Sequence, residues 1–188
     1  LVATGCDSFP SWDTRFKNFS KYYTEVELIE AMAELLPART WDQNSKGNFL
    51  NNHPQGTHLV ITGGEPLLGW QKAYPSLLSG LIRKGLHDLT FETNGTQPLT
   101  PEFRTYLEMP HLTTTFSISP KLSSSGEKWE DAIKPTAVAT YQFKYANTFL
   151  KFVIDSEHQL KEVQDVVNEY EKIGLHCPVY LMPVGGTG

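Results

Sequence analysis

The segment VITGGEP, residues 60–66, ends a short apolar run with two glycines, a glutamate and a proline. Gly63 and Gly64 carry no side chain that would keep a ligand away from the backbone, and Glu65 follows them directly. A carboxylate in this place can accept hydrogen bonds from the ammonium group of an amino-acid-like ligand. A solvated loop glutamate, or a charge attracted to the first amides of a helix, would give the same residues. Glu65 is therefore a candidate site residue with both interpretations open.

Two further segments carry polar side chains that could bind a ligand. FETNGT, residues 91–96, surrounds a glycine with polar groups, and SISPK, residues 117–121, ends in Lys121. Asn-Gly is also a common turn dipeptide, and Lys121 could equally be a solvated lysine after a strand. Neither segment identifies a site by itself.

The elements that must position these residues alternate along the chain. Apolar runs typical of strands occur near residues 60, 90, 116, 151 and 180, and helical patterns lie between them. A spacing of about thirty residues is the length of a strand-helix-strand unit with parallel strands. The pattern predicts a parallel α/β fold, either an open doubly wound sheet or a full or partial (β/α) barrel. In both, ligands bind at the carboxyl ends of the strands, where TGGEP, ETNGT, SPK and MPVGG would meet.

Local signals predict some of the element boundaries. Thr24 and Glu27 have capping-box spacing ahead of the helical segment VELIEAMAELL. Ser156 and Gln159 are expected to open another helix in the same way. The polar segment 37–57 is expected to be a long surface loop.

Composition limits the class of protein. The 188 residues suit a single domain, which we expect to be truncated at both ends. A net charge of −5 argues against a broad phosphate-binding surface, so nucleic acid is not an expected partner. No apolar run has the length of a membrane helix, and the two cysteines allow at most one disulfide. These features predict a cytoplasmic protein without a membrane partner.

Common motifs of other sites are absent from the sequence. It has no G-x-x-x-x-G-K-[ST] phosphate loop, no G-x-S-x-G nucleophile elbow and no H-E-x-x-H metal pair. The six histidines are therefore interpreted as surface or structural residues.

Taken together, the motifs resemble those of a known superfamily. CDS at 6–8, TGGEP at 62–66, ETNGT at 92–96, SPK at 119–121, LKFVI at 150–154 and LMP at 181–183 follow one another in the order found in radical S-adenosylmethionine enzymes. Within that superfamily the chain resembles the 7-carboxy-7-deazaguanine synthases, lyases that contract a tetrahydropterin ring in queuosine biosynthesis. The resemblance spans nearly the whole chain and implies a partial (β/α)6-type parallel barrel in one domain, residues 1–188.

The resemblance implies metal ligands near the start of the chain. Cys6 would be a thiolate ligand of a [4Fe–4S] cluster whose remaining iron binds S-adenosylmethionine. Reduction of that cofactor would start the conversion of 6-carboxy-5,6,7,8-tetrahydropterin, and an electron donor such as flavodoxin would be a partner. Ser8 would bind Mg²⁺ beside the substrate carboxylate. A hydroxyl that merely turns the chain after Cys6 would fit the sequence equally well.

The resemblance also implies residues that bind S-adenosylmethionine and the substrate. The turn formed by Gly63, Gly64 and Glu65 would hold the amino group of the methionine moiety. Thr62 would face the pterin substrate. Polar groups after the next two strands are candidates for the carboxylate and the ribose of the cofactor: Asn94, Ser119 and Lys121.

The chain departs from the superfamily pattern at the cluster motif C-x-x-x-C-x-x-C. Ala3 stands three residues before Cys6, so either further cysteines precede an insertion or the chain has lost the cluster. Cys177 lies beside a strand and is expected to be a buried structural thiol. Two other functions remain open: a different radical enzyme, such as a glycyl-radical activating enzyme, and an inactive barrel that binds S-adenosylmethionine or a partner protein. A homodimer is compatible with each of them.

Overall fold

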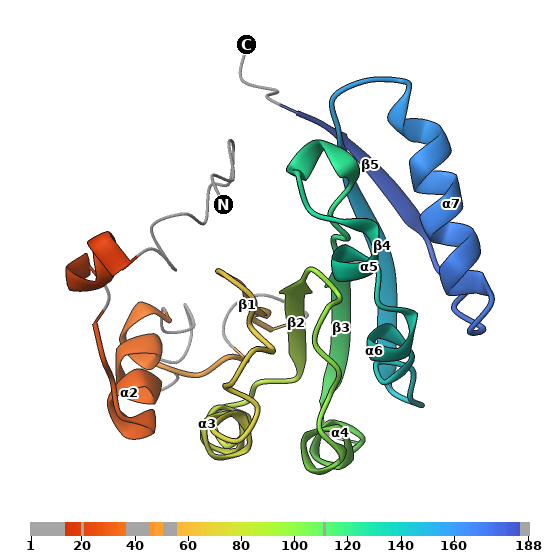
Figure 1. Cartoon of the computed structure of the whole chain (residues 1–188). Helices are drawn as coiled ribbons and strands as arrows, with labels where there is room; N and C mark the ends of the chain where they lie inside the picture. The colour runs from red at the N-terminus through yellow and green to blue at the C-terminus, as the bar shows by residue number, and fades with distance from the viewer. Residues whose placement is uncertain (1–13, 20, 37–45, 51–55, 111, 185–188) are drawn as a thin grey trace.

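The protein forms a five-stranded parallel sheet with helices between the strands (Figure 1). The computed structural model describes residues 14–19, 21–36, 46–50, 56–110 and 112–184. The predicted parallel α/β fold is confirmed. The strands are β1 (Leu59–Ile61), β2 (Asp88–Thr93), β3 (Thr113–Ile118), β4 (Ala146–Ile154) and β5 (Val179–Pro183). The helices are η1 (Thr14–Phe19), α2 (Glu25–Leu35), α3 (Tyr74–Ile82), α4 (Pro101–Leu107), η3 (Ser123–Ser125), α5 (Trp129–Ala132), α6 (Pro135–Ala139) and α7 (Gln159–Glu171).

The order of the strands in the sheet is their order in the chain, β1-β2-β3-β4-β5. Every neighbouring pair is parallel, and Phe91 of β2 lies opposite Phe116 of β3. Because this order has no reversal, the sheet is not doubly wound. The predicted partial (β/α)6-type barrel is not confirmed either. Within the described residues β1 and β5 do not pair with any further strand, so the sheet stays open.

The two faces of the sheet differ in burial. Helices α3, α4 and α7 lie along one side of it (Figure 1), and side chains that point to this side, such as Phe91 and Thr93 of β2, are buried. Glu92, which lies between them and points the other way, keeps part of its surface exposed. Val60 of β1 and Val153 of β4 point the same way as Glu92 and are 48% and 44% exposed. The described helices therefore leave one face of the sheet accessible, which we call the open face.

Aromatic rings form the centre of the core between the sheet and the helices. Phe91 and Phe116 are fully buried and stack with ring centroids 5.8 Å apart. Tyr74 of α3 and Phe103 of α4 pack against Phe91 at 5.5 and 5.9 Å, and Tyr141 stacks on Phe116 at 4.5 Å. Each such pair contributes about 0.5–1.5 kcal/mol beyond the burial of its area. One continuous cluster thus fixes β2 and β3 relative to each other.

The first long helix begins as predicted. The Thr24 hydroxyl accepts a hydrogen bond from the Glu27 backbone N–H at 3.3 Å, and the Glu27 carboxylate accepts one from the Thr24 N–H at 2.8 Å. These two bonds satisfy donors that the first turn of α2 would otherwise leave unpaired. The predicted capping box is confirmed.

The predicted capping box at the start of α7 is wrong. The helix begins at Gln159, and the residue before it makes no capping bond with its side chain. Gln159 is only 7% exposed, and its side chain accepts from the Asp155 N–H at 2.7 Å and donates to the Ser124 hydroxyl at 2.6 Å. A buried amide has to satisfy both of its ends, so these contacts replace the local box with Ser156.

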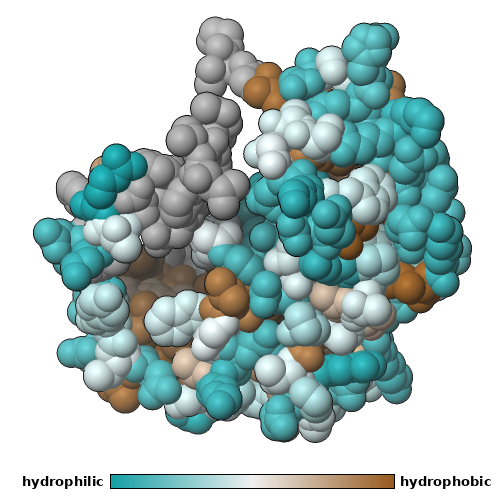
Figure 2. Space-filling view, in the orientation of Figure 1, coloured by the Kyte–Doolittle hydropathy of each residue, from teal (hydrophilic) through white to brown (hydrophobic). Residues whose placement is uncertain are grey.

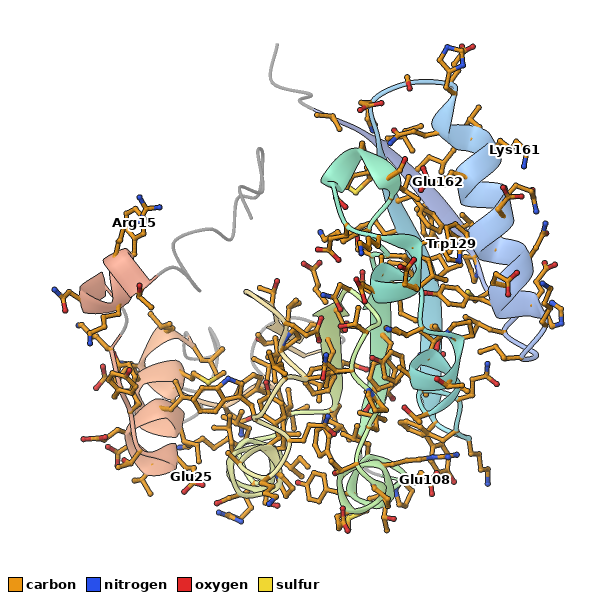
Figure 3. All side chains as sticks on the ribbon, viewed as in Figure 1. Arg15, Glu25, Glu108, Trp129, Lys161 and Glu162 are labelled. Atoms are coloured by element: carbon orange, nitrogen blue, oxygen red, sulfur yellow. The ribbon has the colours of Figure 1, made fainter. Side chains whose placement is uncertain are left out.

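Helix α7 also holds the segment after β3 through Glu162. Figure 3 shows this side chain directed from α7 towards that segment. Its carboxylate accepts hydrogen bonds from the N–H and the hydroxyl of Ser123 at 2.7 and 2.8 Å. The carboxylate therefore fixes the start of η3 against α7.

The loop at 37–57 was predicted to lie on the surface. Where the structure describes it, Phe49 is 3% exposed, and its N–H donates to the Lys84 carbonyl at 2.7 Å. The Thr57 N–H in turn donates to the Phe49 carbonyl at 2.6 Å. This part of the loop is therefore packed against the segment that ends α3.

Strand β5 is exposed along its whole length. Val179, Tyr180, Leu181 and Met182 keep 40%, 55%, 45% and 46% of their surface accessible. Its ladder to β4 is formed, with Leu181 opposite Phe152. Among the described residues, β5 is thus an apolar edge strand that is covered on neither face.

The remaining surface is mixed in character. On the face shown in Figure 2, hydrophobic residues form small separate areas among hydrophilic ones. None of the described helices is both long and apolar enough to span a bilayer.

Candidate functional site

Three polar turns meet at the carboxyl edge of the sheet. TGGEP follows β1, ETNGT ends β2, and SPK follows β3, and parallel strands end at the same edge. The Asn94 N–H donates to Glu65 Oε2 at 2.8 Å, which joins the first two turns. The Ser119 N–H donates to the Thr93 carbonyl at 2.8 Å, which joins the last two. The predicted convergence is confirmed for these three turns, whereas the fourth predicted segment, MPVGG, lies partly outside the described residues.

Glu65 has a defined position within this group. Its Oε1 accepts from the Thr93 hydroxyl at 2.7 Å and from the Leu67 N–H at 3.1 Å, while its Oε2 accepts from Asn94. The carboxylate is partly exposed and is not simply a solvated group, because hydrogen bonds from three residues orient it. It is therefore a preorganised negative charge at the edge of the sheet.

The two glycines before Glu65 have conformations that other residues rarely adopt. Gly63 has φ 89° and Gly64 has φ 47°, both in the left-handed region. A Cβ built on Gly63 would meet no atom within 4 Å among its described neighbours. Among the described residues the turn therefore leaves open space at Gly63, two residues before Glu65, where ligand atoms can approach the backbone.

A second polar group lies on the open face of the sheet. The Thr62 hydroxyl donates to Glu92 Oε2 at 3.3 Å, and Lys151 Nζ lies 3.5 Å from Glu92 Oε1. The side chains of Lys151 and Glu92 are 24% and 42% exposed, so water screens this ion pair only in part. Glu92 belongs to the candidate segment FETNGT, whereas Lys151 was not predicted as a site residue. The alternation in LKFVI, which places Lys151 between buried Leu150 and buried Phe152, is the signal that could have indicated it.

The other predicted cofactor residues differ in their surroundings. The Asn94 side chain holds its own turn, because Oδ1 accepts from the N–H and hydroxyl of Thr96 at 2.9 and 2.7 Å. Its backbone N–H, not its side chain, contacts Glu65. Ser119 lies beside the ETNGT turn, and exposed Lys121 forms no ion pair with another described residue. Lys121 thus offers a positive charge at the same edge.

Two buried tyrosines support the turns from the helix side. The Tyr74 hydroxyl donates to the Pro66 carbonyl at 2.6 Å, and the Tyr141 hydroxyl donates to the Gln97 carbonyl at 2.6 Å. Burial raises the pKa of Tyr74 to about 12, and the negative charge of Glu65 adds to the shift. Burial is also the main cause that raises the pKa of Tyr141. Both hydroxyls therefore stay protonated at neutral pH and fix the ends of the two turns.

The predicted metal ligands Cys6 and Ser8 lie outside the described residues. Across the described ranges, no group of three His, Cys, Asp or Glu side chains could hold a metal ion. Cys177 is a free and partly buried thiol. Burial raises its pKa, and a hydrogen bond with the Leu150 backbone opposes this rise. A neutral thiol packed against the core agrees with the predicted structural role.

Comparison with known proteins finds relatives that share one name. No protein-family model matches the chain, and no solved structure matches it at a significant level. A 7-carboxy-7-deazaguanine synthase of Pyrobaculum aerophilum is 32% identical over 131 residues, which are 68% of this chain and 50% of the relative. Proteins of the same name from Rhodopirellula baltica and Clostridium acetobutylicum are 34% and 28% identical, over 68% and 69% of this chain and 48% and 52% of theirs. The chain spans about half the length of the curated relatives it matches.

The fold and the polar turns define an α/β protein with a candidate ligand site at the carboxyl edge of a parallel sheet. The relatives share one name, and the motifs TGGEP, ETNGT and SPK had indicated the same group. The chain belongs to the 7-carboxy-7-deazaguanine synthase family.

Proposed function

We propose that this chain forms the cofactor and substrate site of an enzyme that converts 6-carboxy-5,6,7,8-tetrahydropterin to 7-carboxy-7-deazaguanine, with loss of ammonia, in queuosine biosynthesis. The observation that supports this most is the similarity to three 7-carboxy-7-deazaguanine synthases over 68–69% of the chain. A glycyl-radical activating enzyme and an inactive barrel are less favoured, because the three relatives share a different name.

The geometry at Glu65 fits S-adenosylmethionine. A carboxylate offers about four acceptor positions, and the described donors use three of them, so one position on Oε2 is left for the ammonium group of the cofactor. The open space at Gly63 admits the atoms that follow this ammonium group. Lys121 and the turn at Asn94 and Ser119 are the candidates for the carboxylate and the ribose.

The cofactor would supply the chemistry, and the chain would position it. Bound together with a [4Fe–4S] cluster, S-adenosylmethionine would supply the radical that starts the ring contraction, with an electron donor such as flavodoxin as the partner. Cys6 would be one cluster ligand and Ser8 a ligand of Mg²⁺. The described residues include no group of three His, Cys, Asp or Glu side chains that could hold either metal.

The open face of the sheet would receive the substrate. Thr62 lies next to the turn that would hold the cofactor, and its hydroxyl is joined to Glu92. Lys151 adds a positive charge that is complementary to the carboxylate of the pterin. A heterocycle with donors, acceptors and a negative charge thus finds matching groups on this face.

The proposal is tested with the full-length protein under anaerobic conditions. Supplied with S-adenosylmethionine, a reductant and the tetrahydropterin, it should release 7-carboxy-7-deazaguanine, measured by mass spectrometry. Glu65→Gln should weaken S-adenosylmethionine binding by about 1.5–3 kcal/mol, the contribution of a hydrogen bond to a charged group. Glu108→Gln is the matched control, because Glu108 is an exposed carboxylate that, among the described residues, pairs with Arg104 of α4. A parent protein that forms no product would refute the proposed reaction.

A separate measurement tests the cluster. Cys6→Ala in the full-length protein should lose iron, sulfide and the cleavage of S-adenosylmethionine, whereas Cys177→Ala should retain all three, because Cys177 is a partly buried thiol with a raised pKa. Iron and sulfide analysis of both variants decides this. A Cys6→Ala protein with the parent's iron content would show that Cys6 is not a ligand.

A further inference from the structure

Thr93 is a buried threonine whose hydroxyl is hydrogen-bonded to Glu65 and Gly95 and also interacts with the Tyr141 side chain. It ends β2 and is 3% exposed. Its oxygen accepts a hydrogen bond from the Gly95 N–H at 3.1 Å, and its proton is donated to Glu65 Oε1 at 2.7 Å. An N–H can only donate, so the hydroxyl oxygen must accept there, and its own proton is free to point at the carboxylate. The two contacts together determine the direction of this hydroxyl.

The hydroxyl decides which oxygen of Glu65 is available to a ligand. Oε1 has two donors, Thr93 and the Leu67 N–H, and this fills the acceptor positions of that oxygen. Oε2 has a single described donor, the Asn94 N–H. A cationic ligand group is therefore directed to Oε2.

No other described side chain is hydrogen-bonded to Glu65. Of the described donors to Glu65, Leu67 and Asn94 act through backbone N–H groups, and Thr93 alone acts through its side chain. The Asn94 side chain is bonded to Thr96 instead. The Thr93 hydroxyl is thus the one described side-chain group that a substitution can remove from the carboxylate while leaving its backbone donors in place.

We propose that Thr93 is a positioning residue for the ammonium group of S-adenosylmethionine, which it serves by holding Glu65 with Oε2 towards the ligand. This inference rests on the proposed function. Removing the hydroxyl has two opposing effects on ligand binding. The carboxylate loses its orientation, and it also loses a donor that partly offsets its negative charge, so it would attract a cation more strongly. The orientation effect dominates, because the ammonium contact depends on direction and the freed Oε1 can instead bind water.

Calorimetry on the full-length, cluster-loaded protein without reductant measures binding in the absence of turnover. Thr93→Val, which matches the shape of threonine without its hydroxyl, should weaken S-adenosylmethionine binding about tenfold. Thr93→Ser retains the hydroxyl and should stay within about threefold of the parent. Val also leaves the Gly95 N–H without its partner, so thermal unfolding of each variant is recorded. Thr93→Ala leaves room for water at that N–H and replaces Val if the Val variant does not fold.

Two further measurements separate positioning from a general structural effect. An analogue of S-adenosylhomocysteine without the amino group should bind the parent and Thr93→Val equally. The double variant Glu65→Gln with Thr93→Val should bind S-adenosylmethionine no more weakly than Glu65→Gln alone, because Thr93 acts through Glu65. An equal loss for the analogue, additive losses in the double variant, or tighter binding by Thr93→Val would overturn the inference while Glu65→Gln still supports the proposed function. A parent protein that does not bind S-adenosylmethionine would overturn both.

Discussion

Substituting Gly95 with alanine should destabilise the protein for two distinct reasons. Gly95 is buried in the ETNGT turn with φ 79°, a conformation that costs an L-residue about 1–2 kcal/mol. An added Cβ would lie 2.9 Å from Ile118 Cγ2 and 3.3 Å from Val138 Cγ2. Overpacking of this kind costs about 1–3 kcal/mol. The sum for Gly95→Ala is therefore a loss of about 2–5 kcal/mol in the free energy of unfolding.

Gly126 provides a control that separates these two contributions. It also has φ 79°, but a Cβ there would meet no atom within 4 Å among the described residues. Gly126→Ala should therefore cost only the conformational part, about 1–2 kcal/mol. The difference between the two variants measures the packing against Ile118 and Val138.

Equilibrium unfolding in urea measures the free energy of unfolding of both variants. An unchanged slope of this free energy against urea concentration confirms that the same transition is compared. The Gly95 variant should also bind S-adenosylmethionine more weakly, because the Gly95 N–H orients Thr93. Equal destabilisation of the two variants, within about 0.5 kcal/mol, would refute the packing argument.

Three further predictions concern stability. Thr24→Ala should cost about 1 kcal/mol and speed hydrogen exchange in the first turn of α2, and unchanged exchange there would contradict the role of the cap. The pKa of Tyr74 rises from 10.0 to about 12 on folding, so its neutral form stabilises the fold below pH 10, and this stabilisation is lost as the pH rises towards 12. Tyr74→Phe should therefore flatten the fall in unfolding free energy over that pH range, and a curve parallel to the parent's would exclude the effect. Glu162→Ala should cost about 0.5–1.5 kcal/mol and expose the Ser123 N–H to exchange. Glu169→Ala, which breaks a surface pair with Lys172 at the end of α7, should change neither the stability nor that exchange.

Features that depend on neighbours in the sequence could be predicted. Thr24 and Glu27 are three residues apart, and their capping box forms as the spacing indicates. The strands follow from short apolar runs, and their regular spacing gave the parallel arrangement. At the start of α7 the same local rule failed, because the side chain of Gln159 is buried by tertiary packing and satisfies Asp155 and Ser124 instead.

The details of the candidate site depend on contacts between distant residues. Glu65 was selected from its local turn, but its partner Thr93 is 28 residues away, and Lys151 reaches Glu92 across 59 residues. No periodicity within one element encodes such a pair. Closure of the sheet is also a global property, because it requires strand tilt, stagger and pairing of both edges to agree. The motifs could therefore indicate where the site lies, while its hydrogen bonds and the open sheet came from the structure.

The exposed strand β5 has a consequence for handling the protein. Among the described residues no strand pairs with the free edge of β5, and an exposed run of Val, Tyr, Leu and Met at such an edge is a template on which another molecule can add a strand. Pro178 and Pro183 stand on either side of these four residues and have no N–H to donate, so they limit how far an intermolecular ladder can extend. The two prolines thus limit the addition of a strand from another molecule. A charged side chain in place of Met182 should limit it further and improve the yield of monodisperse protein.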